Sequence, residues 1–280
     1  MRVIHTEEIT EAVRNMCMEA NYFLCEDVRN AIVKAAENET SAIGRGILSD
    51  LLENAEIARN EQIPVCQDTG MAVFFVRLGQ EVQVQGGLLS DAINEGVSRG
   101  YVDGFLRKSV LSDPIRRKNT GDNTPAVIHY DIVSGDKLEI TFAPKGFGSE
   151  NMSALKMLKP SDGIEGVKRF VLDTVCAAGS NPCPPIVVGV GIGGTMEKCA
   201  CLAKHALTRS LEERNPDPFY AQLEQELLQK INHLGIGPQG FGGKTTALAV
   251  NVETFATHIA GLPCAVNINC HVTRHKKVIL

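Results

Sequence analysis

Three of the nine cysteines in this chain stand in polar or turn-forming sequence contexts that a cysteine packed in a core does not need. Cys66 begins the segment CQDTG, Cys183 is flanked by prolines in NPCPP, and Cys270 follows polar residues in NINCH. No other cysteine has a comparable context. Cysteine thiolates hold zinc and iron–sulfur centres, and a centre with three protein ligands keeps one coordination position open for chemistry. These three thiols therefore predict a catalytic metal centre.

The residues that follow Cys66 provide groups for acid–base chemistry. An acid two residues from a metal ligand lies within reach of a molecule bound at the open position, so Asp68 is a candidate general acid or base. Gln67 is a candidate neutral donor to a substrate carboxylate, and Gly70 allows the chain to turn sharply. An isolated Asp-Thr-Gly is more typical of a simple turn, in which the acid bonds its own backbone. The adjacent cysteine favours the catalytic interpretation.

Two other segments could bind an anion. Arginine forms bidentate pairs with carboxylates, so Arg107 is a candidate ligand, although alone it is more typical of a surface residue. Residues 145–151 (KGFGSEN) offer backbone N–H groups that could cradle an anion. The alternative for this glycine-rich stretch is an ordinary loop at the end of a hairpin.

Composition restricts the class of protein and its partners. Of the 280 residues, 44% are hydrophobic and 22% are charged, which is ordinary for a globular protein. A formal net charge of −5 argues against nucleic acid or an anionic membrane as a partner. The N-terminal residues lack the apolar core of a signal peptide, and no apolar stretch is long enough to span a bilayer. We expect a cytoplasmic protein in which thiols stay reduced.

The hydrophobic pattern predicts an α+β fold: an N-terminal helical region, followed by mixed or antiparallel sheets packed with helices. Helical spacing covers residues 7–59, 88–100, 160–178, 196–213 and 221–234. Strand patterns cover residues 71–76, 81–85, 126–142, 186–190, 247–257 and 265–270, with the third containing two strands around a turn at 134–136. We expect two subdomains around the metal site, with residues 1–150 and 151–280 as the division. No internal repeat is visible.

Two glycine-rich segments resemble nucleotide-binding motifs. Residues 189–194 (GVGIGG) match the dinucleotide fingerprint and would support a nicotinamide-dependent oxidoreductase. Because the following helix leads to another helix rather than to a strand, we favour a turn where glycine permits close approach of strand and helix. Residues 242–245 (GGKT) resemble a phosphate loop, but Pro238 replaces its first glycine. Lys244 and Thr245 could line an anion site or be solvated at a helix start.

The remaining cysteines and most histidines have sequence contexts typical of structural residues. Cysteine among apolar or helical neighbours is usually a buried, inert thiol. We assign this role to Cys17, Cys25, Cys176, Cys199, Cys201 and Cys264. We assign ordinary core or surface roles to His5, His129, His205, His233 and His275.

Five segments together resemble the alpha subunit of the class I, iron–sulfur fumarate hydratases and the related L-tartrate dehydratase alpha subunit. They occur in the same order as in that family, and the similarity covers nearly the whole chain. The segments are residues 66–70, 145–151, 181–185, 235–240 and 269–271.

The resemblance implies roles for individual residues. It implies that Cys66, Cys183 and Cys270 hold a 4Fe-4S cluster. It assigns substrate contacts to Gln67, Asp68, Arg107 and the glycine loop at Gly148, with Asp68 also catalytic. It places His258 in the catalytic site, although without the resemblance His258 would be interpreted as a helix-face histidine.

The resemblance also implies an activity and a partner. The activity is a hydro-lyase that interconverts (S)-malate with fumarate and water in the tricarboxylic acid cycle, with the cluster as Lewis acid. The alternative is L-tartrate dehydration, and residues 106–109 and 148–151 look more like the fumarate enzyme. Single-chain relatives continue into a second domain that completes the site, so we expect a separate beta subunit in a hetero-oligomer. A metal-binding subunit that only scaffolds its partner is a further alternative.

Overall fold

The computed structural model describes residues 2–280, which form two compact units, each built from separate stretches of chain. Unit 1 contains the chain up to Leu24, Ala55–Phe147 and Arg274–Leu280. Unit 2 contains Cys25–Asn54 and Gly148–Thr273. The division proposed at residue 150 cuts the chain once, whereas each of these units also includes a stretch from the other half.

The sheet of unit 1 has four strands in the order β10-β5-β2-β4. The central strand β2 (Met71–Gly79) is parallel to β4 (Val127–Val133) and antiparallel to β5 (Leu138–Lys145). β5 is also antiparallel to β10 (Lys276–Ile279), a short strand that the sequence pattern did not predict. A separate parallel pair joins β1 (Arg2–His5) to β3 (Val82–Gln85).

The two strands predicted over residues 126–142 are present, but they do not pair with each other. β2 lies between β4 and β5, so the turn at residues 134–136 joins two strands on either side of it. The apolar run at the start of β2 is buried on both faces of the sheet, which suits a central strand. β2 therefore takes the central place between β4 and β5. The interpretation of residues 126–142 as two strands paired in a hairpin around the turn at 134–136 is wrong.

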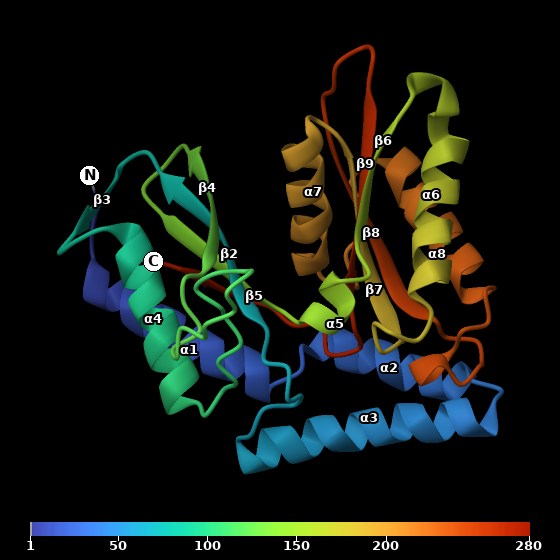
Figure 1. The fold of residues 1–280 in the computed structure, drawn as a ribbon, viewed down its shortest axis with the longest axis horizontal. Helices are drawn as coiled ribbons and strands as arrows, with labels where there is room; N and C mark the ends of the chain where they lie inside the picture. The colour runs from blue at the N-terminus through green and yellow to red at the C-terminus, as the bar shows by residue number, and fades with distance from the viewer. Residues whose placement is uncertain (1) are drawn as a thin grey trace. The chain divides into compact units, whose positions relative to one another are not determined.

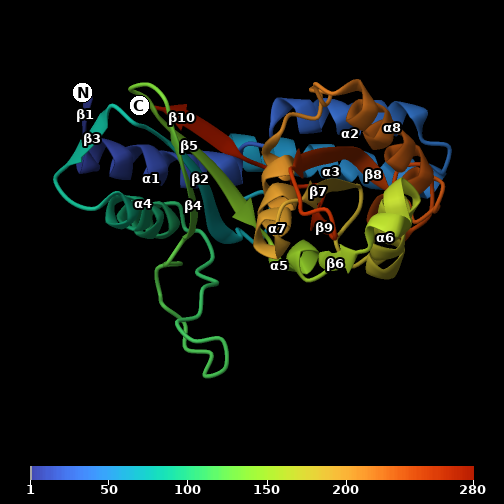
Figure 2. The ribbon, with the colours of Figure 1, turned by 90° about the horizontal axis from the view of Figure 1, so that it is seen from above.

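Two helices cover one face of this sheet. α1 (Thr6–Tyr22) and α4 (Leu89–Asp103) enclose a core with β2 and β5, in which the rings of Phe74 and Phe142 lie 5.0 Å apart. The loop from α4 to β4 extends away from the sheet (Figure 2). This loop carries Arg107.

The helical region predicted over residues 7–59 is interrupted twice. It forms α1, α2 (Glu26–Asn38) and α3 (Ala42–Glu61). Glu39 follows α2, and its carboxylate accepts the backbone N–H groups of Thr40 and Ser41. The hydroxyl of Ser41 then accepts the N–H of Gly44 in the first turn of α3.

The sheet of unit 2 repeats the pairing pattern of unit 1. Its order is β6-β9-β7-β8. The central strand β7 (Ile186–Gly193) is parallel to β8 (Ala247–Phe255) and antiparallel to β9 (Leu262–Asn269), which pairs with the unpredicted strand β6 (Ala154–Leu158). In both units, the central strand is parallel to the strand of its sheet that comes next in the sequence. It is antiparallel to the strand of its sheet that follows that one. The two mixed sheets, each packed with helices, confirm the α+β class.

Helices cover both faces of the unit 2 sheet. α6 (Gly163–Ala178) and α8 (Pro218–Asn232) pack on one face, and α7 (Met196–His205) packs on the other (Figure 1). Alternate residues of β7 follow this division: Val188 and Val190 face the α6–α8 core, whereas Gly189 and Gly191 face α7. Short helical segments lie at Phe147–Glu150 (α5), Pro160–Asp162 (η1), Ala206–Thr208 (η2) and Pro238–Gly240 (η3).

The long helix predicted over residues 196–213 ends early, at His205. The chain then makes one 3-10 turn and a loop whose hydrogen bonds go to other elements. Ser210 and the N–H of Leu211 both donate to the Asp27 carboxylate on α2, at 2.9 and 2.8 Å. Arg209 pairs with Glu224 on α8. These interactions with α2 and α8 replace the backbone hydrogen bonds that would continue the helix. Among residues 2–280, no helix has the length and apolar character needed to cross a membrane.

Candidate active site

Unit 1 gathers four of the predicted site residues at the entrance to its central strand. Cys66, Gln67 and Asp68 lie in the loop that leads into β2. The sulfur of Cys66 accepts the N–H of Asp68 at 3.4 Å. Asp68 accepts the N–H of Gly70 through Oδ1 at 3.1 Å, so the loop is the turn that its sequence also predicted. Oδ2 of Asp68 accepts the N–H of Phe147 at 2.9 Å, which fixes the direction of the carboxylate.

Arg107, the fourth residue, is attached to the same loop through its backbone. Both its N–H and its carbonyl group bond to the hydroxyl of Thr69, at 3.0 and 3.2 Å. The side chains of Gln67 and Arg107 are exposed, whereas Asp68 is partly buried. The structure therefore brings the backbone of Arg107 next to the loop that carries Gln67 and Asp68, three residues whose side chains suit acid–base chemistry on an anionic molecule.

Arg274 belongs to this group and was not predicted. It is 5% exposed, and its Nη2 donates to the carbonyl oxygen of Asp68 at 2.7 Å. A buried guanidinium beneath the loop adds positive charge next to the candidate acid. The only feature of the sequence that could have pointed to Arg274 is its position shortly after Cys270.

Unit 2 gathers two of the predicted thiols. Cys183 precedes β7 and Cys270 follows β9, and these strands are antiparallel, so both cysteines lie at one end of the sheet. His271 joins them: its backbone N–H donates to the carbonyl oxygen of Cys183 at 3.3 Å. Gln239 supports the same turn by donating from Nε2 to the carbonyl oxygen of Pro184 at 2.7 Å.

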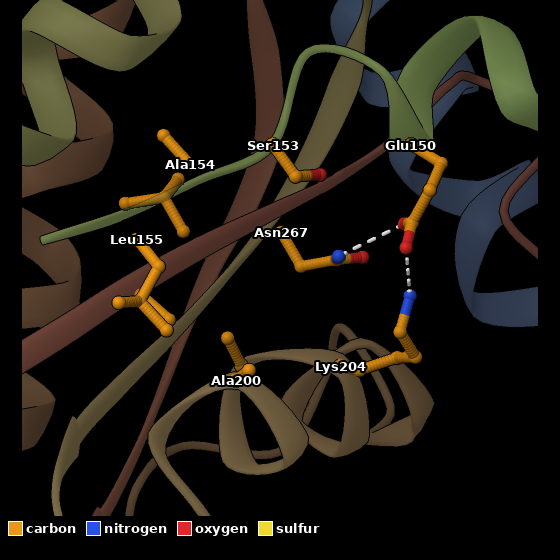
Figure 3. Close-up of a pocket in the computed structure, with 10 residues that line it drawn as sticks. Glu150, Ser153, Ala154, Leu155, Ala200, Lys204 and Asn267 are labelled. Atoms are coloured by element: carbon orange, nitrogen blue, oxygen red, sulfur yellow. Dashed lines mark hydrogen bonds and ion pairs between the residues drawn. The ribbon is translucent and has the colours of Figure 1, made fainter. Parts of the chain in front are cut away.

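Gly148 lies at this same end of unit 2. A Cβ added to it would be 3.9 Å from the carbonyl oxygen of Asn181, two residues before Cys183. The segment is anchored by Glu150, which pairs with Lys204 on α7 at 2.5 Å and accepts from Nδ2 of Asn267 on β9 at 2.9 Å (Figure 3). These bonds hold the glycine segment against the sheet.

The Glu150–Lys204 pair lies at the polar end of a cavity of about 300 Å³. Small apolar side chains of β6, α7 and β9 line the rest, as Figure 3 shows. The cavity therefore lies between α7 and the β6–β9 edge of the sheet.

His258 lies elsewhere in unit 2. It is in the loop after β8, not on a helix, and its Nδ1 accepts the N–H of Ala260 at 3.2 Å. Because β8 is parallel to β7, its end lies opposite the end that carries Cys183. At about 3.3 Å per residue, β7 separates the two ends by roughly 25 Å. Unit 2 brings Gly148, Cys183 and Cys270 together but not His258.

Burial separates only some of the remaining cysteines from the three candidates. Cys17, Cys199 and Cys264 are buried, and burial raises the pKa of Cys199 to about 11 and that of Cys264 to about 12. Thiols with such pKa values are poor ligands and nucleophiles at neutral pH. The expectation of burial was wrong for the other three, because Cys176 is exposed and both Cys25 and Cys201 are partly exposed.

The chemistry and exposure of the three candidates allow thiolate ligation. Cys183 is exposed, and Cys66 and Cys270 are partly exposed, so a metal would have access to each. Cys183 has a positive φ of 55°, a backbone conformation that residues other than glycine adopt infrequently. Among residues 2–280, no three His, Cys, Asp or Glu side chains are grouped as a metal site. Cys66 belongs to unit 1 and the other two to unit 2.

Both nucleotide-like motifs have structural roles. A Cβ on Gly189 or Gly191 would clash with backbone carbonyl oxygens of α7, so these glycines allow helix and strand to approach closely. The N–H groups of Lys244 and Thr245 do bind an anion, but it is the carboxylate of Glu39, at 2.8 and 3.3 Å. That site is filled by the protein itself.

Comparison with known proteins shows the family to which the chain belongs. The family model described as fumarate hydratase (Fumerase) matches residues 10–279. The chain belongs to this family. One relative of this chain is a provisionally named L(+)-tartrate dehydratase subunit alpha of Methanocaldococcus jannaschii. The two sequences are 45% identical over 95% of both chains. The L(+)-tartrate dehydratase subunit alpha of Escherichia coli is 34% identical over 95% of this chain and 89% of its own.

A third relative, the L(+)-tartrate dehydratase subunit alpha of Shigella sonnei, is 33% identical over 98% of this chain and 91% of its own. All three names describe a subunit, and membership of the family supports hydro-lyase chemistry.

Proposed function

We propose that this chain is the alpha subunit of a hydro-lyase that dehydrates a 2-hydroxydicarboxylate, with L-tartrate as the first candidate substrate. The observation that carries the proposal is full-length similarity to three relatives named as L(+)-tartrate dehydratase alpha subunits. The sequence placed (S)-malate and fumarate first, and the names of the relatives reverse that order.

The interconversion of (S)-malate and fumarate is the second candidate. The family description names fumarate hydratase, and residues 106–109 and 148–151 resemble that enzyme. Both reactions remove a hydroxyl group from one carbon and a proton from its neighbour, so one set of site residues serves either substrate.

We propose that Cys66, Cys183 and Cys270 are the protein ligands of a 4Fe-4S cluster. Their access to solvent, and the restrained turns that carry them, support this assignment. A cluster held by three thiolates would supply a Lewis acid for the leaving hydroxyl group.

The protein residues then move the proton and hold the substrate. Hydroxide is a poor leaving group because the pKa of water is about 15.7, so an acid must protonate it. Asp68 would donate that proton during dehydration and take it back during hydration; its hydrogen bonds to Gly70 and Phe147 keep the carboxyl group in one orientation. Arg107, Gln67 and the N–H groups near Gly148 would bind the substrate carboxylates.

Two parts of this site would come from other chains. The base that removes the carbon-bound proton is assigned to a beta subunit, because the relatives of this chain are named as alpha subunits. His258 lies at the far end of the unit 2 sheet from Cys183. We therefore propose that it acts in the site of a second alpha chain, within a hetero-oligomer.

The test is an anaerobic assay of the alpha chain co-expressed with its beta subunit and reconstituted with iron and sulfide. L-tartrate and (S)-malate are compared through kcat/KM. A preference for L-tartrate supports the proposal, and a preference for (S)-malate supports the second candidate. Absence of turnover with both substrates, in a complex that shows cluster absorbance, would contradict the proposal and favour a scaffolding role. Turnover that requires a nicotinamide cofactor would favour an oxidoreductase.

A further inference from the structure

Thr69 connects the loop that carries Asp68 to the segment that carries Arg107. Thr69 is 1% exposed and follows Asp68 directly. Its hydroxyl accepts the N–H of Arg107 at 3.0 Å and donates to the carbonyl oxygen of the same residue at 3.2 Å. One side chain therefore satisfies both backbone groups of a residue 38 positions away.

Asn123 makes a second connection of the same kind. It is fully buried, and its Oδ1 accepts the N–H of Ser109 at 2.7 Å while its Nδ2 donates to the carbonyl oxygen of Gly70 at 3.2 Å. Its φ of +66° is a conformation that asparagine tolerates better than most residues. Thr69 and Asn123 thus bind the two segments at neighbouring points.

The helix before Arg107 is fixed to the same loop. The hydroxyl of Tyr101, on α4, lies 2.9 Å from the carbonyl oxygen of Thr69 and 3.0 Å from that of Gly70. Burial raises the pKa of Tyr101, so this hydroxyl stays protonated and can donate. Neither segment belongs to a sheet at these points, so side chains supply the partners that a strand ladder would otherwise provide.

We infer that Thr69 and Asn123 are positioning residues that set where the Arg107 guanidinium group lies relative to the Asp68 carboxylate. This inference rests on the proposed function, because it assumes that both groups act on one substrate. The Arg107 side chain is exposed, so its backbone attachment determines the volume that its guanidinium group can reach. A shift of about 1 Å at a reacting group is enough to lower a rate about 100-fold.

The test uses the reconstituted complex with Thr69→Val, which keeps the shape of the side chain and removes both hydrogen bonds. We expect KM for the dicarboxylate to rise about tenfold or more while cluster absorbance stays unchanged. Thr69→Ser should restore KM, because it keeps the hydroxyl. Thr10→Val is the matched control: Thr10 is 3% exposed, and its hydroxyl joins α1 to Ala92 on α4 at 3.1 Å. The control should lower thermal stability but leave KM unchanged.

A second readout separates this inference from the proposed function. Amide hydrogen exchange of the complex should show faster exchange at Arg107 in Thr69→Val, and at Ser109 in Asn123→Ala, whether or not either dicarboxylate is turned over. Unchanged exchange in these variants, or unchanged KM in Thr69→Val of an active complex, would overturn the positioning role. If Thr69→Val does not fold, Asn123→Ala provides the kinetic test, because it removes the bonds to both Ser109 and Gly70. We expect its KM to rise, and wild-type kinetics in that variant would also overturn the role.

Discussion

The backbone N–H of His271 donates to the carbonyl oxygen of Cys183 at 3.3 Å, and its ring nitrogen Nδ1 lies 3.0 Å from the same oxygen. These two residues are 88 positions apart in the chain. The bond joins the turn before β7 to the turn after β9 and keeps Cys183 close to Cys270. The fold of unit 2 therefore brings the two cysteine-bearing turns together.

Substitution of the candidate ligands should remove the cluster. Cys66→Ser, Cys183→Ser and Cys270→Ser should each abolish the brown absorbance of the reconstituted complex, since a hydroxyl group is a poor replacement for a thiolate. Cys176→Ser is the control, because Cys176 is also exposed but lies on α6. Loss of absorbance in the control, or its retention in any of the three variants, would contradict the assignment of ligands.

Asp68→Asn should keep the cluster and lose turnover. General acid–base catalysis contributes about 10²–10⁴-fold, so we expect kcat to fall within that range. Asparagine still offers an oxygen to the N–H of Gly70, so the loop should keep its turn. Asp136→Asn, in the exposed turn between β4 and β5, should behave as wild type. Normal kcat in Asp68→Asn would exclude Asp68 as the acid.

The carboxylate of Glu39 should stabilise unit 2 in a pH-dependent way. Burial alone would raise the pKa of Glu39, but bonds from the N–H groups of Ser41, Lys244, Thr245 and Thr40 outweigh it and lower the pKa. A lowered pKa means that the stabilisation is present above the unfolded-state value of about 4.3 and is lost as pH falls through the folded-state value.

Glu39→Gln should therefore lower Tm at pH 7, because it replaces hydrogen bonds to a charged carboxylate, each worth about 1.5–3 kcal/mol, with weaker bonds to a neutral amide. The difference in Tm from wild type should shrink as the pH is lowered below about 4. Thermal unfolding, monitored by circular dichroism, measures the Tm of the variant and of the wild type at each pH. Glu37→Gln is the control, since Glu37 is exposed on the same helix, and it should not change Tm. A Tm difference that grows at low pH would contradict this account.

Complementation between inactive chains tests whether His258 serves a second chain. His258→Gln and Cys183→Ser should each be inactive alone. Co-expression of the two variants should recover activity, because the site that keeps Cys183 would receive its histidine from the other chain. A mixed complex without activity would place His258 in its own chain's site, and an active His258→Gln complex would remove it from the mechanism.

The sequence indicated candidate site residues from local features of the chain, but it did not indicate how the fold arranges them. Cys66, Cys183 and Cys270 stand out because turns and polar neighbours are local properties of the chain. Thr69, Asn123 and Arg274 could not be found this way, since their partners are backbone groups that only the tertiary fold brings near. Three other thiols expected to be buried are not, because helical neighbours do not determine which face of a helix meets the core.

The positions of the strands were easier to predict from the sequence than the way in which the strands pair. Apolar runs marked β2 and β7, but alternation in residues 126–142 could not show that β2 lies between β4 and β5. β10 and β6 are short and have no clear pattern of their own, so they become strands only because β5 and β9 provide an edge for pairing.

The matching pairing order of the two sheets gives two of the candidate ligands equivalent places. Cys66 comes shortly before β2 and Cys183 shortly before β7, so each lies ahead of the corresponding central strand. Cys270 follows β9, and no cysteine stands in the corresponding place after β5. The chain leading into a central strand therefore carries a candidate ligand in both units, whereas the chain leaving the antiparallel neighbour carries one only in unit 2.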